Sequence, residues 1–475
     1  MTLYIKGFAL ALSALITLPL AAEEDVLLYF YEPSLSLEHQ ETFSRMVNHA
    51  NNAEFARART HSERLIAAHE TAEEHNRELY GKLLINHGII DSADFAYEQG
   101  LASINDGLRH LEHKQNPFTT DLLRGLMAKA ISEFSMDLTE GAEDTFRRAQ
   151  HIVHRNQGVY SSGQLAVISW LTKTNLKRGE VLAADREQRF TLRVAEQAFG
   201  AESVDMIPFL NSLGAYFASR GSTIPPLMPS GARLQRDLLF RRSVTLYQRA
   251  VDIIEANYGE DDIRLVKPLR GLANARLLQI TNRKHAEAAL TRSFDIIDSH
   301  PGSELTDKAQ AMIDLGDFYT ITLDTRAAPL YLQAWNLLQE DQQTRDLAMQ
   351  LFDVPARLFP RTSPTLFLDR RPDAAEEDED LYVKLEYAVT SAGKVKSVKV
   401  LEKNVPNEQV RILRYGLRNA IFRPRIQEGN LVNTEGLVLY QPFEVFRKIN
   451  NSQPSPVDND LLGPPESAPR KQMAR

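Results

Sequence analysis

The chain has 475 residues, a formal charge of -8 and no cysteine, which together exclude several classes of protein. Without cysteine there is no disulfide framework, no thiol catalysis, no lipid-anchoring cysteine and no cysteine-based metal site. The acidic balance argues against general nucleic-acid binding, so no nucleic-acid partner is expected. With 43% hydrophobic and 25% charged residues, the composition is that of a globular protein with two or three domains.

The N-terminus has the features of a secretory signal peptide, which we place at residues 1–22. Lys6 precedes an apolar run over residues 7–20, and Ala21-Ala22 lies before the acidic residues 23–25. The apolar run is shorter than the ~20 residues that a membrane-spanning helix needs. We therefore expect export to the periplasm, with cleavage after Ala22. The alternative is an uncleaved anchor that holds the protein in the inner membrane, facing the periplasm.

Residues 35–352 repeat at a fixed offset and predict a series of paired helices. Apolar residues recur there at three- and four-residue spacing, which is typical of amphipathic helices. Gly158 and Leu171 match Gly200 and Leu213, 42 residues further on. A second pair of units is offset by 43 residues. The two pairs are 59 residues apart because of a Gly- and Pro-rich insertion at residues 221–231, which predicts a loop.

Each repeat unit predicts two antiparallel helices, for example over residues 265–281 and 284–299. Such pairs cannot bury their apolar faces alone, so we expect five to seven of them to stack into an α-solenoid. At about 42 residues, the units resemble the longer tetratricopeptide-like repeats of the kinesin-light-chain type. Armadillo- or HEAT-like stacking would leave a similar pattern. The predicted fold class is therefore mostly α.

After Phe352 the helical pattern is interrupted by prolines, and residues 353–380 are predicted to form a linker that is first Pro-rich and then acidic. Six acidic residues lie between residues 373 and 380, and their mutual repulsion favours an extended chain. The Pro-rich tail over residues 450–475 predicts disorder.

Residues 381–447 change their hydrophobic period twice, which predicts a small α+β domain with the order ββαβ. Alternating apolar positions over residues 381–389 and 395–400 indicate two strands joined by a tight turn at Gly393. A helix is predicted next, because four apolar residues follow at helical spacing: Val410, Leu413, Leu417 and Ile421. Arg423-Pro424 is expected to end this helix. A last alternation over residues 437–445 indicates the third strand.

This order of elements resembles the C-terminal domain of the TonB energy transducers. The resemblance rests on residues 387–400 (YAVTSAGKVKSVKV), 422–425 (FRPR), 428–432 (EGNLV) and 440–446 (YQPFEVF), and it covers about 65 of the 475 residues. The family pattern is a Gly-centred hairpin, a helix that ends at an aromatic-basic-proline corner, a Gly turn and an edge strand. An unrelated small α+β domain is the alternative.

The resemblance carries expectations about function, and the chain departs from some of them. In the TonB family, an N-terminal transmembrane helix couples to a proton-driven motor, a Pro-rich spacer crosses the periplasm, and the C-terminal domain pulls on outer-membrane receptors. Here residues 7–22 lack the histidine of the family's anchor, and helical repeats replace the spacer. The Gln-Pro-rich segment that precedes the family's first strand is also missing. The resemblance therefore implies partner binding more directly than energy transduction.

The final strand is the expected partner-binding element. Proteins that resemble TonB offer this strand as an open edge, onto which a receptor peptide adds as a further strand. The candidate residues form one row of Leu437, Leu439, Gln441 and Phe443, and a second row of Val438 and Tyr440. The alternative is an edge that pairs with nothing or closes a homodimer. Pro442 also counts against simple pairing, because it removes one backbone donor.

Three arginines at helical spacing form a second candidate surface: Arg411, Arg414 and Arg418. They would contact an anionic polymer, such as peptidoglycan stems, or an acidic partner. The alternative is the solvated outer face of a helix whose apolar side is buried.

No pattern in the sequence predicts a catalytic, cofactor or metal site. His69-Glu70 and His75 imitate a zinc-peptidase signature, but six residues separate the histidines where a single helix face needs four. Ser391 and Lys394 fit a Ser-x-x-Lys pattern, but they fall in the predicted hairpin turn and not at the start of a helix. Two further pairs at i,i+3 spacing are typical of solvated helix residues: His110 with His113, and His151 with His154. We therefore expect a protein that is not an enzyme.

The sequence as a whole predicts a periplasmic interaction scaffold linked to TonB-dependent outer-membrane transport or to envelope assembly. Its expected partners are outer-membrane receptors or other envelope proteins. A flexible linker between two modest sites would raise overall avidity through effective concentration. The alternative is a genuine TonB-type energy transducer with an uncleaved N-terminal membrane anchor.

Overall fold

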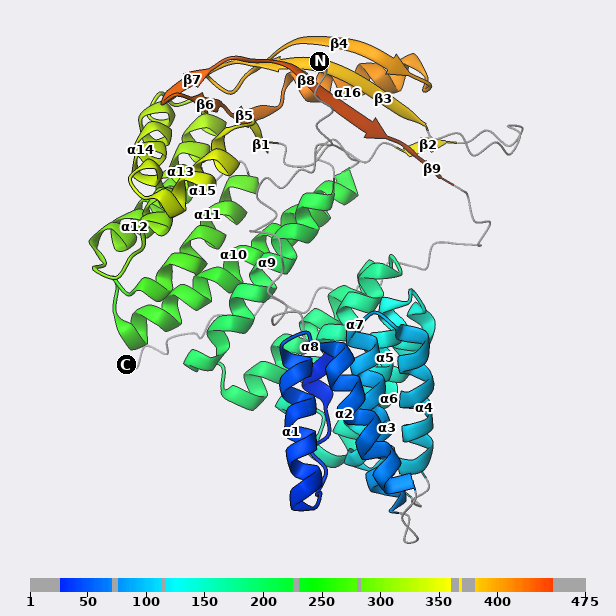
Figure 1. The fold of residues 1–475 in the computed structure, drawn as a ribbon. Helices are drawn as coiled ribbons and strands as arrows, with labels where there is room; N and C mark the ends of the chain where they lie inside the picture. Colours follow the sequence, from blue (N-terminus) through cyan, green and yellow to red (C-terminus); the bar gives the residue numbers. More distant parts are fainter. Residues whose placement is uncertain are drawn as a thin grey trace, which may run out of the picture.

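The computed structural model describes residues 26–70, 76–112, 116–224, 230–279, 283–359, 367–369 and 381–446. The predicted signal peptide, the acidic run and the predicted tail all lie outside these ranges. Within the described ranges the chain is mostly helical, as predicted (Figure 1). None of the described helices has the length and apolar character of a membrane-spanning segment.

The helices that precede the first strand form consecutive pairs and a final single helix. They are α1 (Leu37–Asn51), α2 (Phe55–Glu70), α3 (Arg77–Ala93), α4 (Tyr97–Leu111), α5 (Leu123–Ser135), α6 (Thr139–Gln157), α7 (Leu165–Lys177), α8 (Val181–Phe199), α9 (Ile207–Thr223), α10 (Ser230–Tyr258), α11 (Val266–Leu278), α12 (Arg283–Ser299), α13 (Leu305–Thr322), α14 (Ala327–Gln339) and α15 (Gln342–Phe352). Each helix packs on the next in the chain, so the described part of the protein is a tetratricopeptide-like stack.

The sequence offsets correspond to one loop that recurs between helix pairs. Gly158, Gly200 and Gly259 each follow the second helix of a pair with φ values of 95°, 90° and 97°. Glycine adopts this backbone region without the strain that a Cβ atom brings, so it ends the helix cleanly. Three residues later a side chain caps a short 3-10 turn by accepting a backbone hydrogen bond, at Ser161, Ser203 and Asp262.

A repeated ion pair connects successive second helices. Arg249 of α10 pairs with Glu196 of α8 and donates to the carbonyl of Ala201. Arg292 of α12 does the same with Glu255 of α10 and the carbonyl of Glu260. The acceptors are 59 residues apart and the arginines 43, which are offsets also found between the repeat units. The periodicity therefore extends to specific polar contacts.

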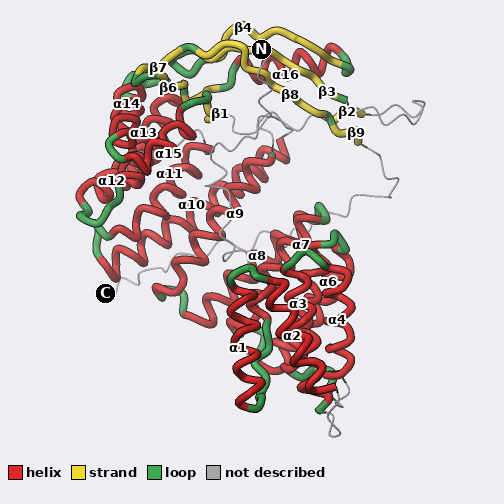
Figure 2. Tube along the Cα trace, in the orientation of Figure 1, coloured by secondary structure: helices red, strands yellow, loops and turns green. Residues whose placement is uncertain are grey.

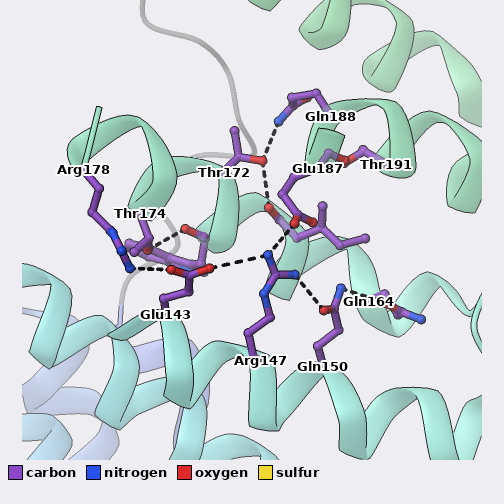
Figure 3. Close-up of polar contacts among 12 residues, drawn as sticks. Glu143, Arg147, Gln150, Gln164, Thr172, Thr174, Arg178, Glu187, Gln188 and Thr191 are labelled. Carbon is purple, nitrogen blue, oxygen red and sulfur yellow. Dashed lines mark hydrogen bonds and ion pairs between the residues drawn. The ribbon is translucent and has the colours of Figure 1, made fainter. Parts of the chain in front are cut away.

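Buried polar side chains separate two apolar cores within the stack. One core runs from Val26 to Leu171 and the next begins at Ala195. Between them, Arg147 pairs with Glu187 at 2.6 Å and Gln188 donates to Thr172 at 3.0 Å (Figure 3). We call the buried members of this set the polar layer: Gln150, Gln164, Thr172, Thr174, Asn175, Asp185, Glu187 and Gln188. At the next junction, α8 and α9 share only a small contact.

The C-terminal module contains the predicted hairpin, helix and final strand, with several short strands added. Its elements are β1 (Ala356–Phe359), β2 (Phe367–Asp369), β3 (Tyr382–Val389), β4 (Val395–Lys403), α16 (Asn407–Arg418), β5 (Ile421–Arg423), β6 (Arg425–Gln427), β7 (Asn430–Val432), β8 (Thr434–Pro442) and β9 (Glu444–Phe446). The three-stranded sheet has the order β4-β3-β8 and is antiparallel. Val410, Leu413 and Leu417 of α16 cover the face that carries Val383 and Leu385. Figure 2 shows the short strands β1, β6 and β7 beside α13–α15, whereas β3, β4 and β8 extend away from these helices.

Three predicted boundaries were wrong in detail. Ile421 does not continue the helix, because α16 ends at Arg418 and Ile421 pairs with Phe359 of β1. The insertion at residues 221–231 is not wholly a loop, since its first residues end α9 and its last begin α10. The final strand is interrupted at Phe443, between β8 and β9.

Gly393 is the turn residue whose substitution should damage the module most. It has a φ of 74°, and a Cβ atom there would overlap the carbonyl oxygen of Phe422 and approach Thr320 of α13 at 3.1 Å. Gly436 has a similar φ of 70° but an open environment. We expect Gly436→Ala to cost about 1–2 kcal/mol from backbone strain alone. Gly393→Ala should cost a further ~1–3 kcal/mol from overpacking.

Urea denaturation of the two variants and the wild type tests this expectation through their free energies of unfolding. Equal losses for Gly393→Ala and Gly436→Ala would contradict the role assigned to the contact with Phe422.

Candidate protein-interaction site

The strand β8 is an edge of the three-stranded sheet. It pairs with β3 along its whole length, from Thr434 opposite Val389 to Pro442 opposite Tyr382. Among the residues that the structure describes, no strand pairs with the other side of β8. Beyond Phe443, β9 pairs in parallel with β2. The free edge is therefore confined to β8.

Along β8, the backbone N–H and C=O groups of alternate residues face away from β3. The Phe443 N–H donates to the carbonyl of Leu381 at 2.8 Å, so residues in phase with Phe443 bond to β3. Opposed residues of an antiparallel pair alternate between bonded and outward-facing positions. The N–H and C=O groups of Val438 and Tyr440 therefore face away from β3. Pro442 alternates with Val438 and Tyr440 along β8, so its nitrogen also faces away from β3. The backbone donor that proline lacks is therefore not one that would bond to β3.

The side chains of β8 form the two predicted rows. Leu437, Leu439 and Gln441 are half-buried and Phe443 is buried, on the side that faces α16. Val438 and Tyr440 lie on the opposite face, 51% and 53% exposed. The Tyr440 ring stacks on Tyr382 with centroids 5.1 Å apart. An added strand would thus meet free backbone groups flanked by an exposed aromatic surface.

The three arginines of α16 do not form a single free surface. Arg411 is exposed and pairs with Glu408 at 3.6 Å, and Arg418 is also exposed. Arg414 is half-buried and donates to the carbonyl of Val398 at 3.4 Å. Helical spacing placed them on one side correctly, but β4 packs against Arg414. A binding role for the three arginines stays a prediction, with Arg414 less available than the other two.

Arg423 fixes the module to the last helices of the stack. Its side chain is only 1% exposed and forms a two-pronged ion pair with Asp317 of α13, at 2.9 and 2.7 Å. It also donates to the carbonyl of Leu351 at 3.3 Å and lies over the ring of Phe352 at 5.7 Å. Burial alone would lower the pKa of Arg423, but Asp317 outweighs burial and the pKa is raised. The guanidinium therefore stays charged.

Further polar groups complete the environment of this ion pair. The Tyr331 hydroxyl donates to Asp317 at 2.8 Å and lies 2.9 Å from the hydroxyl of Thr320. Burial raises the pKa of Tyr331 well above its usual value, so it remains a neutral donor. A buried carboxylate with this many donors is adequately compensated.

Three other contacts join the module to the stack, and they correct the expectation of flexibility for residues 353–359 of the predicted linker. Strand β1 lies within the predicted linker and pairs with β5, placing Ala356 opposite Arg423. Ile426 is buried in the apolar core of the last helices, and Leu431 packs against that core. Arg425 pairs with Asp353 at 2.9 Å. The module is therefore docked, and its link through residues 353–359 is part of its own fold.

The stack has a cavity of its own between α9 and α11, with a volume of ≈430 Å³. Asn211, 5% exposed, lies in its wall, and its Oδ1 has no hydrogen-bond partner among the described residues. The other polar residues of the wall are Arg264, Lys267, Arg270 and Asp307. This cavity could not be predicted from the sequence, because its lining residues come from three successive helix pairs.

Two of the histidines considered above, His69 and His154, have ordinary hydrogen-bond partners. A ring nitrogen of His69 lies 2.8 Å from the carbonyl of Leu65, and one of His154 lies 2.6 Å from Gln164. His75 and His113 lie outside the described residues. Within the described ranges, no cluster of three or more His, Asp or Glu side chains is arranged to hold a metal ion.

Comparisons with known proteins add little to this geometry. No protein-family model matches the chain, and no curated protein matches it. The chain is similar to a solved structure of BtubC (BKLC) from P. vanneervenii, with 19% identity and a TM-score of 0.36, covering 58% of this chain and 99% of that one. It is also similar to a Rap protein complexed with competence and sporulation factor, with 10% identity and a TM-score of 0.29, covering 66% and 86%.

Neither of these two proteins is of the TonB type, and both TM-scores are too low to support an argument about this chain. The fold is a tetratricopeptide-like stack with a docked α+β module. The resemblance of that module to TonB remains a prediction from sequence.

The buried ion pair should be far more important for stability than the exposed one beside it. Asp317→Asn leaves the Arg423 charge buried without a counter-charge, which we expect to cost about 3–5 kcal/mol. The control is Arg425→Gln, which removes a largely exposed pair on the other side of Pro424 and should cost less than ~1 kcal/mol. Urea denaturation measures both, and limited trypsin digestion reports whether the module is released. Similar small losses for the two variants would contradict the importance of Arg423.

Proposed function

We propose that the protein is an interaction scaffold whose stack and docked module each hold a protein partner. The observation that carries this proposal is the free edge of β8, with outward backbone groups at Val438 and Tyr440. Strand addition to such an edge supplies affinity through main-chain hydrogen bonds, and the exposed face of Tyr440 supplies selectivity. The cavity beside Asn211 is a candidate contact for the partner of the stack.

The proposed setting is the cell envelope, in TonB-dependent outer-membrane transport or in envelope assembly. This part of the proposal rests on the TonB-like sequence of the module and on the signal-peptide features of residues 1–22. The proposed partners of β8 are outer-membrane receptors or other envelope proteins that carry an extended segment. Peptidoglycan is a weaker candidate, because Arg414 is engaged with β4.

Docking of the module changes how two partners would be brought together. A flexible tether raises avidity over a range of distances, whereas a rigid connection does so only for partners whose geometry matches. With Ile426 and Arg423 buried against the last helices, the orientation of β8 relative to the stack is fixed. The proposed scaffold therefore selects for the relative arrangement of its partners as well as for their sequences.

Removal of one outward backbone donor should weaken strand addition without unfolding the module. Val438→Pro deletes an N–H that faces away from β3, just as Pro442 does naturally. Val438→Thr keeps the N–H and the branched side chain, and serves as the matched control. A photo-crosslinking residue at Tyr440, tested in envelope extracts, should capture partners in the wild type and in Val438→Thr. Capture should fall at least about tenfold in Val438→Pro, because each lost backbone bond is worth ~1 kcal/mol and the added strand would lose its register.

A second crosslinking position distinguishes strand addition from non-specific binding. Tyr415 on α16 is 66% exposed and lies away from β8, so it should not capture the same partners. Identical captures from Tyr415 and Tyr440, or captures that persist in Val438→Pro, would exclude the proposed use of the edge.

The state of the N-terminus decides between the scaffold and the energy transducer. Export with cleavage after Ala22 predicts a mature chain that begins at Glu23 and is recovered in the soluble periplasmic fraction. N-terminal sequencing of the purified protein, together with cell fractionation, measures both properties. A chain that retains its first residues and sediments with the inner membrane would favour the transducer.

A further inference from the structure

The first described residues, 26–35, lie across helices of the second and third repeat units. The short 3-10 helix Val26–Tyr29 packs against α3 and α5. Val26, Phe30 and Tyr31 are buried in the same apolar core as the helices of the first half of the stack. This segment precedes α1 in the chain but is held by helices much further along it.

The main chain of the segment is bound by the side chain of Asn86. Asn86 lies in the middle of α3 and is fully buried. Its Oδ1 accepts from the Tyr31 N–H at 2.7 Å, and its Nδ2 donates to the Tyr31 carbonyl at 2.9 Å. The contact satisfies both backbone groups of one residue, as a neighbouring strand would. It therefore recognises an extended backbone whatever side chain that residue carries.

The side chain of Tyr31 is recognised separately. The ring is buried, and its hydroxyl donates to the carbonyl of Asp121 and accepts from the Gly125 N–H, the latter at 3.0 Å. Burial raises the pKa of Tyr31, which keeps the hydroxyl neutral and able to donate. Arg124 of α5 donates to the carbonyl of Phe30. The pocket thus has a donor and an acceptor placed for a phenol, and phenylalanine would leave both unsatisfied.

We propose that this surface of α3 and α5 is a peptide-binding site for an extended segment with a Phe-Tyr pair, and that residues 26–35 are its intrachain ligand. A partner protein that carries such a pair in an extended segment would bind there in exchange for the chain's own segment. The site is distinct from β8 and does not depend on the function proposed for that strand.

The intrachain ligand sets the conditions for exchange. A segment tethered close to its site acts at an effective concentration of the order of mM. A peptide supplied in solution must compete with it, so binding to the wild type should be weak. Weakening the chain's own segment, while leaving the site intact, should reveal the site.

The test uses full-length protein and a fluorescein-labelled peptide of residues 26–36 (VLLYFYEPSLS), with binding followed by fluorescence anisotropy. Tyr31→Ala protein should bind this peptide at least about tenfold more tightly than wild type, because its own segment competes poorly. Adding Asn86→Ala should remove the binding. Adding Asn257→Ala should not, because Asn257 of α10 donates only within its own helix, to the carbonyl of Ile253.

Two further measurements keep the outcome decisive. A peptide with Phe in place of Tyr31 should bind Tyr31→Ala protein about tenfold more weakly, which needs no second protein variant and holds if Asn86→Ala does not fold. If Tyr31→Ala itself is unstable, Tyr31→Phe protein replaces it. Absence of binding to a folded variant would overturn the proposal and make residues 26–35 a fixed part of the core. Binding that ignores both Asn86 and the tyrosine hydroxyl would also overturn it.

Discussion

The buried ion pair between Arg423 and Asp317 is the contact on which the arrangement of the protein depends. A buried charge pair is stable only when its geometry is good and its remaining groups are bonded, and this pair has two short bonds with Tyr331 and Leu351 as further partners. Because Arg423 belongs to β5, its position also fixes β1 and the hairpin turn at Gly393. The orientation of the β8 edge relative to the helices follows from these contacts.

Much of the fold could be predicted because it follows from local periodicity. The alternation of apolar and polar residues predicted β3 and β8, including the two rows of side chains on β8. The helical spacing of apolar residues predicted the buried side of α16. The recurring glycines located the helix pairs. Partners distant in sequence could not be predicted in this way. The sequence placed Arg423 at the expected end of a helix, but its partner Asp317 lies 106 residues earlier in an ordinary helical sequence.

The parts that were missed have physical reasons of the same kind. Strand β1 has four residues between Pro355 and Pro360, too few to show a period, and pairing with β5 decides its structure. Spacing assigned Arg414 to a helix face but gave no information on the strand that covers it. Asn86 resembles any helical asparagine until the fold brings Tyr31 against it, 55 residues away in the chain.

The polar layer at α6–α8 has a consequence for how force and heat act on the molecule. In stacked repeats each unit is stabilised chiefly by its neighbours, so cooperativity passes along the stack only where adjacent units share apolar area. Gln188 and Thr172 are joined by a hydrogen bond within the α7–α8 pair, and the contact that follows, between α8 and α9, is small. The small contact between α8 and α9 is therefore where we expect the stack to bend or to open locally first.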